Sequence, residues 1–413
     1  MARSLKVRLA KSLFIRSLKD LRSGFLELVC PKETLLFGDA SSELRAIIAV
    51  EDEEFFVRAI AGGDVGIGES YMEGQWTSPD VGAVVRLGIR NLALIEQSHP
   101  ILSAITRLKN RLAHRSRANT VQGSRSNISH HYDLGNSFYS LFLDPTMAYS
   151  CACYSKPSDS LEEAQIRKFD RICTRLQIGP GDRILEIGTG WGGFAIHAAR
   201  KYGCQITTTT ISARQHEYAV DWVARSGMRD QVRVLKSDYR ELTGSFDKIV
   251  SIEMFEAVGY RYYDEFFHAC DRLLEPSGKM LIQTITMNEN RFARYLESTD
   301  WIQKYIFPGA ELASISGMLQ SIARATSLSM CESEDIGFHY VHTLNAWRER
   351  FHAALPAVRQ IGFDDRFIRM WDYYLAYCAA AFAERHISDV QLVFAKDRSF
   401  SDSEVTTRQI ADL

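Results

Sequence analysis

Residues 182–203 read DRILEIGTGWGGFAIHAARKYG, and this segment contains the strongest indication of the architecture. Its first residues are apolar enough for a buried strand, a glycine-rich turn follows, and the remainder has the composition of a helix. Gly188 and Gly190 let the backbone turn sharply and leave room for a ligand beside it. A glycine turn between a buried strand and a helix favours a nucleotide-binding unit, although a simple turn has the same G-x-G pattern.

Strand-like and helix-like segments alternate on both sides of this turn. A helix is expected at about 161–176 and another at 213–226, with a third ending near 273. Strand-like segments are CQITTTTIS (204–212), VRVLKSD (232–238), FDKIVSIEMF (246–255) and GKMLIQTIT (278–286). This alternation predicts an α/β, doubly wound and mostly parallel sheet covered on both faces. The C-terminal third is predicted to add helices, the longest at 366–386.

The overall composition is that of a soluble globular protein. The chain has 413 residues, of which 46% are hydrophobic and 24% charged, which leaves room for two or three domains. No apolar run approaches the ~20 residues that a membrane-spanning helix requires. A net charge of −2 does not indicate a nucleic-acid partner.

The cysteines carry little information about a metal or a disulfide framework. Eight are scattered along the chain, and only Cys151 and Cys153 lie close together. This spacing is not that of a zinc site, so we expect no metal centre. Reduced thiols and the lack of a secretory signal favour the cytoplasm. A mitochondrial transit peptide is also basic and amphipathic, and this alternative stays open.

Basic residues are concentrated near the start of the chain. Residues 1–129 carry 18 basic and 14 acidic side chains, and residues 1–24 alone carry seven Lys or Arg against Asp20. Apolar residues between positions 7 and 25 recur at the helical period. A helix with this pattern packs on its own domain or lies on an anionic lipid surface.

We predict three regions from these patterns. Residues 1–109 would form a small α+β domain, and residues 110–129, which are basic and rich in Ser and Asn, a linker. Residues 130–413 would form the catalytic domain. Within the first region, the Gly-rich segment at 61–76 is expected to be a tight, packed turn.

The second predicted strand indicates which nucleotide is bound. An NAD-dependent enzyme places an acidic residue at its end for the ribose, but this chain has Thr207 to Thr210 there. We therefore predict S-adenosylmethionine as the cofactor. Glu186 would support its amino-acid end, Thr210 and Gln215 would bind the ribose, and Asp238 would reach the adenine. A doubly wound domain without a nucleotide is the alternative.

Several motifs, in a fixed order, resemble the cyclopropane-fatty-acyl-phospholipid synthases and the related mycolic-acid methyltransferases. The likeness extends from about residue 60 to 395. It rests on GGDVGIGESYMEGQW, HHYDLGNSFYSLFLDPTMAYSCACY, LEIGTGWGGF, TTISARQ, EMFEAVG, YIFPG, FHYVHTLNAWRERF and YYLAYCAAAF.

The resemblance implies transfer of a methylene or methyl group from S-adenosylmethionine to an acyl-chain double bond. Family members form a carbocation, and bound bicarbonate removes a proton to close a cyclopropane ring. The bicarbonate cradle would use Cys151, Glu256, the backbone at Ile285, and Tyr340, while Cys378 matches a family cysteine. The cyclopropane-forming members have His at the position of Gln283, and an amide cannot shuttle a proton as imidazole does.

The resemblance also places residues around the methyl donor. These are Tyr132 in the lid segment, Tyr149, Ser150, Gly188, Gly190, Trp191, Gly192, Thr210, Gln215, Tyr239 and Arg240. Its implied setting is a homodimer peripherally associated with the inner face of the membrane, with unsaturated phospholipid acyl chains as substrate and no nucleic acid.

Four functional alternatives follow. The cation can be deprotonated to a cyclopropane, or it can rearrange to a methylene- or methyl-branched chain, which Gln283 favours. The protein can also be a lipid-binding relative without activity, or a methyltransferase for a soluble small molecule. Outside the resemblance, Glu256 can be an ordinary ion-pair partner and Tyr340 a packed aromatic.

Overall fold

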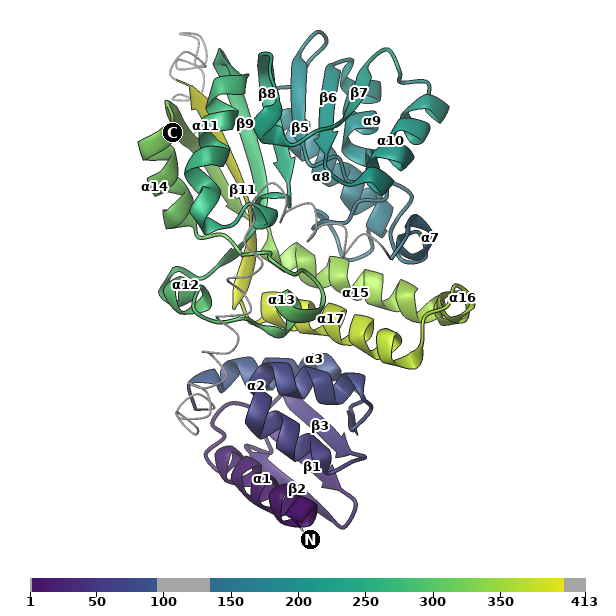
Figure 1. Ribbon diagram of the computed structural model, residues 1–413, viewed down its shortest axis with the longest axis vertical. Coiled ribbons are helices and arrows are strands. Elements are labelled where there is room, and N and C mark those ends of the chain that lie inside the picture. Colours follow the sequence, from purple (N-terminus) through teal and green to yellow (C-terminus); the bar gives the residue numbers. More distant parts are fainter. Residues whose placement is uncertain (1, 95–133, 397–413) are drawn as a thin grey trace. The chain divides into compact units, whose positions relative to one another are not determined.

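The computed structural model describes residues 2–94 and 134–396 (Figure 1). The chain groups into two compact units, which are described separately here. The first consists of residues 1–117, 293–308 and 340–387, and the second of residues 118–292, 309–339 and 388–413. The predicted linker at 110–129 lies outside the described residues.

The second unit is built on a seven-stranded sheet with the order β10-β11-β9-β8-β5-β6-β7. Strands β9, β8, β5, β6 and β7 pair in parallel, and β10 pairs with β11 in antiparallel fashion. The strands are β5 (Arg183–Ile187), β6 (Gln205–Thr210), β7 (Val232–Lys236), β8 (Phe246–Ile252), β9 (Leu274–Met287), β10 (Leu328–Asp335) and β11 (Ile387–Lys396). The doubly wound fold class is therefore confirmed.

Helices cover both faces of this sheet (Figure 1). Alternate strand residues supply two separate cores: Leu185 packs on one face, with α11 and α14, whereas Ile184 packs on the other, with α8, α9 and α10. Strands buried on both faces are expected to be apolar at nearly every position. The helices are α7 (Asn136–Tyr139), α8 (Leu161–Arg175), α9 (Gly193–Tyr202), α10 (Ala213–Arg225), α11 (Tyr263–Leu273), α12 (Glu289–Tyr295) and α14 (Ile315–Ala325), with short 3₁₀ turns η1 (Tyr239–Glu241), η2 (Phe255–Ala257) and η3 (Tyr260–Tyr262).

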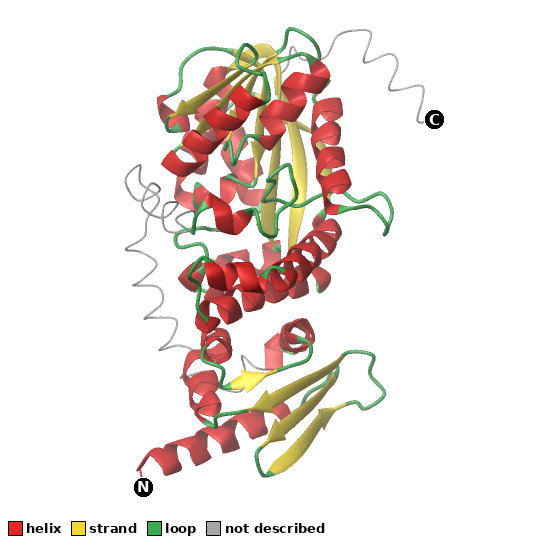
Figure 2. Ribbon diagram, turned by 90° about the vertical axis from the view of Figure 1, so that its right-hand side faces the viewer, coloured by secondary structure: helices red, strands yellow, loops and turns green. Residues whose placement is uncertain are grey.

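The first unit contains a four-stranded sheet with the order β2-β1-β3-β4 (Figure 2). Strands β1 and β3 are parallel, and β2 and β4 are antiparallel to their neighbours. Its elements are β1 (Phe25–Cys30), β2 (Glu33–Gly38), β3 (Arg45–Val50), β4 (Trp76–Thr77), α1 (Ala2–Leu18), α2 (Glu54–Met72), α3 (Val81–Arg90), α13 (Trp301–Tyr305), α16 (Leu355–Gln360) and α17 (Asp365–Ala383). Helix α15 (Gly337–Ala353) begins in the second unit and continues into this one.

The predicted extent of the catalytic domain differs from this division. Residues 293–308 and 340–387 group with the N-terminal residues instead of with the rest of 130–413. The physical reason is the packing of α17 on α2 and α3. The Tyr71 hydroxyl donates to Asp372 over 2.7 Å, and both Arg86 and Arg90 bind Glu384 over 2.7 Å.

The prediction of a tight turn at residues 61–76 is wrong, because most of this segment belongs to α2. The helix is kinked at Gly63 (φ 57°, ψ −132°) and continues to Met72. A Cβ at Gly66 would meet the carbonyl of Arg58 at 2.0 Å, and one at Gly68 would meet Trp301 at 2.4 Å. These glycines therefore allow close packing within a helical segment instead of forming a turn.

The first helix packs on its own domain, as one of the two sequence-based expectations has it, and its contact with a lipid surface stays a prediction. Phe14 packs on Phe55 and Phe56 of α2, with ring centroids 5.2 and 5.5 Å apart. Leu5 and Leu9, in contrast, are 69% and 62% exposed. Among the described residues, no helix combines the length and apolarity needed to span a membrane.

Candidate active site

The glycine turn after β5 is tightly packed at Gly188 and has open space beside it at Gly190. The N–H of Gly188 donates to the carbonyl of Thr209 in β6 over 3.0 Å. Gly188, Gly190 and Gly192 have φ values of 104°, 53° and 97°, in the left-handed region that favours glycine. A Cβ at Gly188 would meet Met254 at 2.9 Å, whereas one at Gly190 would meet nothing within 4 Å.

Glu186, the last residue but one of β5, carries a buried carboxyl group. It is 2% exposed, and burial raises its pKa to about 8 despite a hydrogen bond from Thr208. Its Oε2 accepts no hydrogen bond from any described residue. A buried carboxyl with an unused oxygen suits a cationic group, so it fits the ammonium at the amino-acid end of S-adenosylmethionine.

Thr210 and Gln215 are brought together at the end of β6. The Thr210 hydroxyl donates to Gln215 Oε1 over 2.9 Å and accepts from the N–H of Ser212 over 3.1 Å. Both side chains are buried. This arrangement turns Nε2 of Gln215 away from Thr210, and binding of the ribose by these two residues stays a prediction.

Asp238 follows β7, as expected, but its carboxylate is engaged by Arg240. The guanidinium donates to Oδ1 over 2.8 Å and to Oδ2 over 2.7 Å. In this structure Asp238 therefore holds Arg240, and its contact with adenine stays a prediction. The Tyr239 ring packs on Phe266, with centroids 5.2 Å apart. The donor-binding roles of these residues stay predictions.

Aromatic residues lie beside the glycine turn. The indole Nε1 of Trp191 donates to Asn136 over 2.8 Å, and its ring lies 4.9 Å from that of Tyr139. The ring centroid of Tyr149 also lies 5.3 Å from that of Tyr139. The structure thus brings Tyr149 and Trp191 together around one aromatic residue, while Tyr132 lies outside the described residues.

Glu256 is held by the strand that follows it in the sheet. Its Oε1 accepts from the N–H of Ile285 over 2.5 Å and from the hydroxyl of Thr284 over 3.0 Å. Burial, followed by the charge of Glu253, raises its pKa to about 8. Its Oε2 is buried and receives no hydrogen bond within the described part of the chain.

A second carboxyl group, that of Glu253, lies in the same loop. Its Oε1 accepts from the N–H of Cys151 over 2.7 Å and from Nε2 of Gln283 over 2.8 Å. The same Nε2 donates to Asp389 over 2.9 Å. Burial, followed by Glu253, raises the pKa of Asp389 well above its usual range. Gln283 thus bridges two carboxyl groups.

Lys168 is a fully buried cation near these carboxyl groups. It extends from α8, and its ammonium donates to the hydroxyl of Ser150 over 2.5 Å. Burial lowers its pKa, and the charge of Glu253 is the largest opposing effect. A buried charge is costly unless it is paired, so Lys168 and one ionised carboxylate balance each other.

Sequence reasoning identified Cys151, Gln283, Glu256 and Ile285, but it missed Glu253, Asp389 and Lys168. The backbone at Glu253 gives a signal that only the structure provides. Its φ of 48° lies in the left-handed region, where a non-glycine residue costs about 1–3 kcal/mol and marks functional sites.

The residues present do not fit the bicarbonate cradle that the resemblance implies. The N–H of Cys151 is taken by Glu253, and the N–H of Ile285 is taken by Glu256. The side chain of Gln283 also donates to Glu253. The donors expected to hold a free anion are therefore engaged by carboxyl groups of the chain itself.

Tyr340 and Cys378 group with the first unit. The Tyr340 ring packs on Phe382 and Trp347, with centroids 4.6 and 6.0 Å away. Burial raises the pKa of the Cys378 thiol, which is not the environment of a reactive thiolate. Their predicted roles in catalysis stay predictions.

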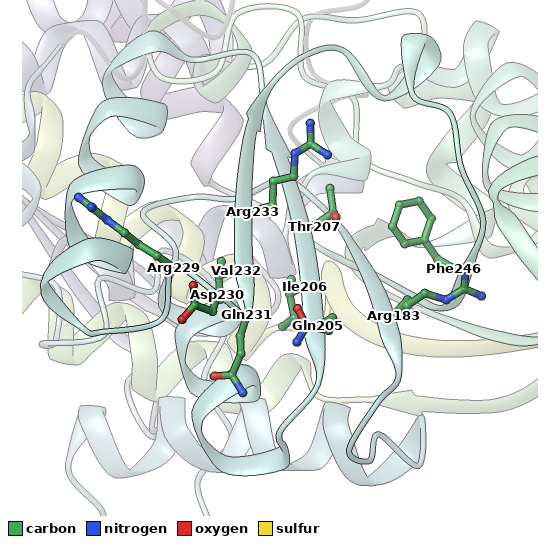
Figure 3. A pocket seen from close by; sticks show the side chains of 10 residues that line it. All are labelled: Arg183, Gln205, Ile206, Thr207, Arg229, Asp230, Gln231, Val232, Arg233 and Phe246. Carbon is green, nitrogen blue, oxygen red and sulfur yellow. The ribbon is translucent and has the colours of Figure 1, made fainter.

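A hollow of about 340 Å³ lies at the end of the seven-stranded sheet where β5 and β6 begin, and Figure 3 shows the side chains that line it. Several of its lining residues open their strands, including Arg183 of β5 and Gln205 of β6. Ligands of open α/β sheets bind beyond the carboxyl ends of the strands, so this hollow is not the expected cofactor site. It is lined by Arg183, Gln205, Ile206, Thr207, Arg229, Asp230, Gln231, Val232, Arg233 and Phe246.

Known proteins share this fold and these motifs. A family model described as mycolic acid cyclopropane synthetase matches residues 119–392. The chain belongs to this family. The resemblance seen in the motifs is thereby confirmed, and the protein is an S-adenosylmethionine-dependent methyltransferase.

Two relatives of the cyclopropane synthetase family match most of the chain. The cyclopropane-fatty-acyl-phospholipid synthase of Escherichia coli K12 is 39% identical over 363 residues, which is 87% of this chain and 89% of that protein. The tuberculostearic acid methyltransferase of Mycobacterium tuberculosis is 37% identical over 344 residues, 81% of this chain and 79% of that protein. Among solved structures, the mycolic acid cyclopropane synthase CmaA1 with SAH and CTAB is 33% identical, with a TM-score of 0.61, and covers 66% of this chain and 98% of its own.

Proposed function

We propose that this methyltransferase alkylates the carbon–carbon double bond of an unsaturated acyl chain in a membrane phospholipid. The product proposed is a cyclopropane fatty acid. The observation that carries the proposal is the extent of the match with the phospholipid synthase. That match covers 87% of the chain, whereas the mycolic acid enzyme CmaA1 covers 66%. The N-terminal region is thus shared with a relative named for a phospholipid substrate.

S-adenosylmethionine supplies a sulfonium methyl group, which the π electrons of an alkene can attack. The open space at Gly190 and the unused Oε2 of Glu186 support binding of this donor beside the glycine turn. Neighbouring aromatic faces, such as that of Tyr149, stabilise a nearby cation by about 0.5–2 kcal/mol. Buried Glu256 adds a polar group that is fixed by Ile285 and Thr284.

The proposed substrate requires contact with a lipid surface, and the first unit is proposed to supply it. On α1, Lys6 and Arg8 are exposed beside the exposed Leu5 and Leu9. Exposed leucines between basic residues suit the boundary between headgroups and acyl chains. We therefore propose a peripheral enzyme on the inner face of the membrane, with the first unit also contributing to a homodimer.

A methylene- or methyl-branched product is the second candidate for the same first step. Gln283 supports it, because its amide donates to Glu253 and Asp389 and cannot itself accept a proton. The cyclopropane and the methylene-branched chain both gain one CH2, but the methylene-branched chain keeps an alkene that ozone cleaves. A saturated methyl-branched chain has two further hydrogen atoms, which an external hydride donor and a proton must supply. The cyclopropane ring resists this cleavage.

Lipid analysis of a strain that expresses the chain tests the proposal. Acyl chains that gain CH2 and resist ozone would support cyclopropanation. Chains that gain CH2 and are cleaved by ozone would indicate the methylene-branched product. Saturated branched chains would indicate the methyl-branched product. Unchanged lipids, with full expression and donor binding, would reject the proposed substrate and favour a lipid-binding protein.

A further inference from the structure

Two donors converge on one carboxylate oxygen in the second unit. The N–H of Cys151 and the amide of Gln283 reach Oε1 of Glu253 over 2.7 and 2.8 Å. The backbone closes the same loop, because the N–H of Glu253 donates to the carbonyl of Gln283 over 2.8 Å. This arrangement is a built anion site, and its anion is a side chain of the protein.

The orientation of the Gln283 amide is set by a chain of hydrogen bonds that begins at an arginine. Arg175 donates to Oε1 of Gln391 over 3.0 Å, and Nε2 of Gln391 donates to Oε1 of Gln283 over 3.0 Å. A guanidinium can only donate, so the direction of every bond in this chain is fixed. Nε2 of Gln283 must therefore point at Glu253 and Asp389.

The buried carboxyl groups around Glu253 carry one negative charge among them. Asp389 is fully buried, is hydrogen-bonded to Glu253, and has a pKa raised by burial and by that neighbour. Glu256 also has a raised pKa, while Lys168 and the buried thiol of Cys151 face the same cluster. Like-charged carboxyl groups this close cannot all ionise. One carboxylate opposite the Lys168 ammonium is the balanced state.

We propose that the Glu253 carboxylate, paired with Asp389, accepts the proton released by the alkylated acyl chain, in place of a free bicarbonate ion. This inference rests on the proposed function. A C–H bond of the transferred methyl group breaks, and its electron pair forms the ring-closing C–C bond at the cationic carbon. The proton passes to Glu253, which becomes neutral and later loses it to water. No oxidant or further reactant is needed.

A glycine at position 253 provides the sharpest test. Because Glu253 has a φ of 48°, glycine suits its backbone, and we expect Glu253→Gly to fold and to bind the donor as the wild type does. In this variant the N–H of Cys151 and the side-chain amide of Gln283 would no longer have the Glu253 carboxylate as their acceptor. Turnover should fall by about 10²-fold or more and recover in a saturable way when bicarbonate is added to CO2-depleted buffer.

Glu253→Gln is the matched variant. Its amide fills the same space without a carboxylate, so its turnover should be as low as that of Glu253→Gly and should not recover with bicarbonate. As a remote control, Asp247→Asn alters a carboxylate at the opposite end of β8, where it binds Arg183, and should leave turnover unchanged.

Assays of the wild-type protein distinguish a failure of the proposed function from a failure of the role proposed for Glu253. It must first release S-adenosylhomocysteine with unsaturated vesicles, and failure here rejects the proposed function itself. Wild-type turnover should then be the same with and without bicarbonate. Activity that requires bicarbonate in the wild type, or a Glu253→Gly variant that turns over normally without it, would overturn the assignment of Glu253.

Discussion

The N–H of Ile285 donates to Oε1 of Glu256 over 2.5 Å. Strand β9 thereby fixes a carboxyl group that lies in the loop after the neighbouring strand, β8. The hydroxyl of Thr284 binds the same oxygen, so Oε2 is left as a buried acceptor without a donor from the described residues. This geometry suits the proposed role of Glu256 beside a reacting partner.

Replacing Glu256 with Gln tests this role. The glutamine amide has the size of the carboxyl group and keeps the contacts of Oε1, but it carries no negative charge. Turnover should therefore fall by about 10²-fold. Affinity for the donor, measured by calorimetry, should stay the same because Glu256 is not part of the glycine turn. Unchanged turnover would remove Glu256 from the mechanism.

Glu186 predicts a dependence of stability on pH. Its pKa rises from 4.5 to about 8 in the folded chain, so between these values the folded state binds more protons than the unfolded state. The free energy of unfolding should therefore fall as pH rises from about 5 to 8, by on the order of 1 kcal/mol per pH unit.

Urea unfolding at pH 5.5 and 7.5 measures this effect. Glu186→Gln should reduce the difference between the two pH values, whereas the exposed control Glu217→Gln should keep it. Donor binding near pH 7 should release protons, because an ammonium beside Glu186 lowers its pKa. Equal pH dependence in the wild type and Glu186→Gln would contradict the assignment.

Two glycines form a matched pair for testing the donor site. Gly190 and Gly181 have φ values of 53° and 89°, and a Cβ at either would meet nothing within 4 Å. Alanine should therefore strain both positions by about 1 kcal/mol or somewhat more. Only Gly190→Ala should weaken donor binding, because its methyl group enters the space beside the turn. Similar donor affinity for both variants would place the donor elsewhere.

Helix α1 predicts a salt-sensitive attachment to lipid. A Lys6→Glu/Arg8→Glu variant should bind anionic vesicles at least about 30-fold more weakly, since each of the two basic residues near such a surface contributes about 1 kcal/mol. Lys11 is left unchanged because it binds Glu33 and Glu53. Donor affinity should not change.

The control for this variant carries two charge reversals on the other unit, Arg229→Glu and Lys236→Glu, at exposed positions. It should bind vesicles as the wild type does. If the α1 variant loses vesicle and donor binding equally, the helix has a structural role. High salt should weaken the wild type toward the level of the α1 variant.

The sequence predicts the doubly wound sheet because buried strands leave a direct local pattern. Residues such as Leu185 and Ile184 point to opposite faces, and both faces are covered, so adjacent positions in the middle of the strand are apolar. Strand β11 was missed for a related reason. It carries the buried polar residues Asp389 and Gln391, whose partners lie more than 100 positions away in the chain.

Residues of the candidate site could be predicted where they belong to a local sequence motif. They could not be predicted where their role depends on contacts between distant parts of the chain. Gly188, Gly190 and Glu256 lie in such motifs. The role of Glu253 depends on a backbone conformation and on Cys151 and Gln283, which no local pattern reveals. Likewise, α17 groups with the N-terminal helices because of side-chain contacts between distant segments.

Incubation of the purified wild-type protein with S-adenosylmethionine and vesicles of unsaturated phospholipid tests alkylation of the acyl chain directly. S-adenosylhomocysteine and the modified lipid should form in equal amounts, with each modified chain heavier by one CH2. Absence of S-adenosylhomocysteine, or its release without any change in the acyl chains, would contradict the proposed reaction.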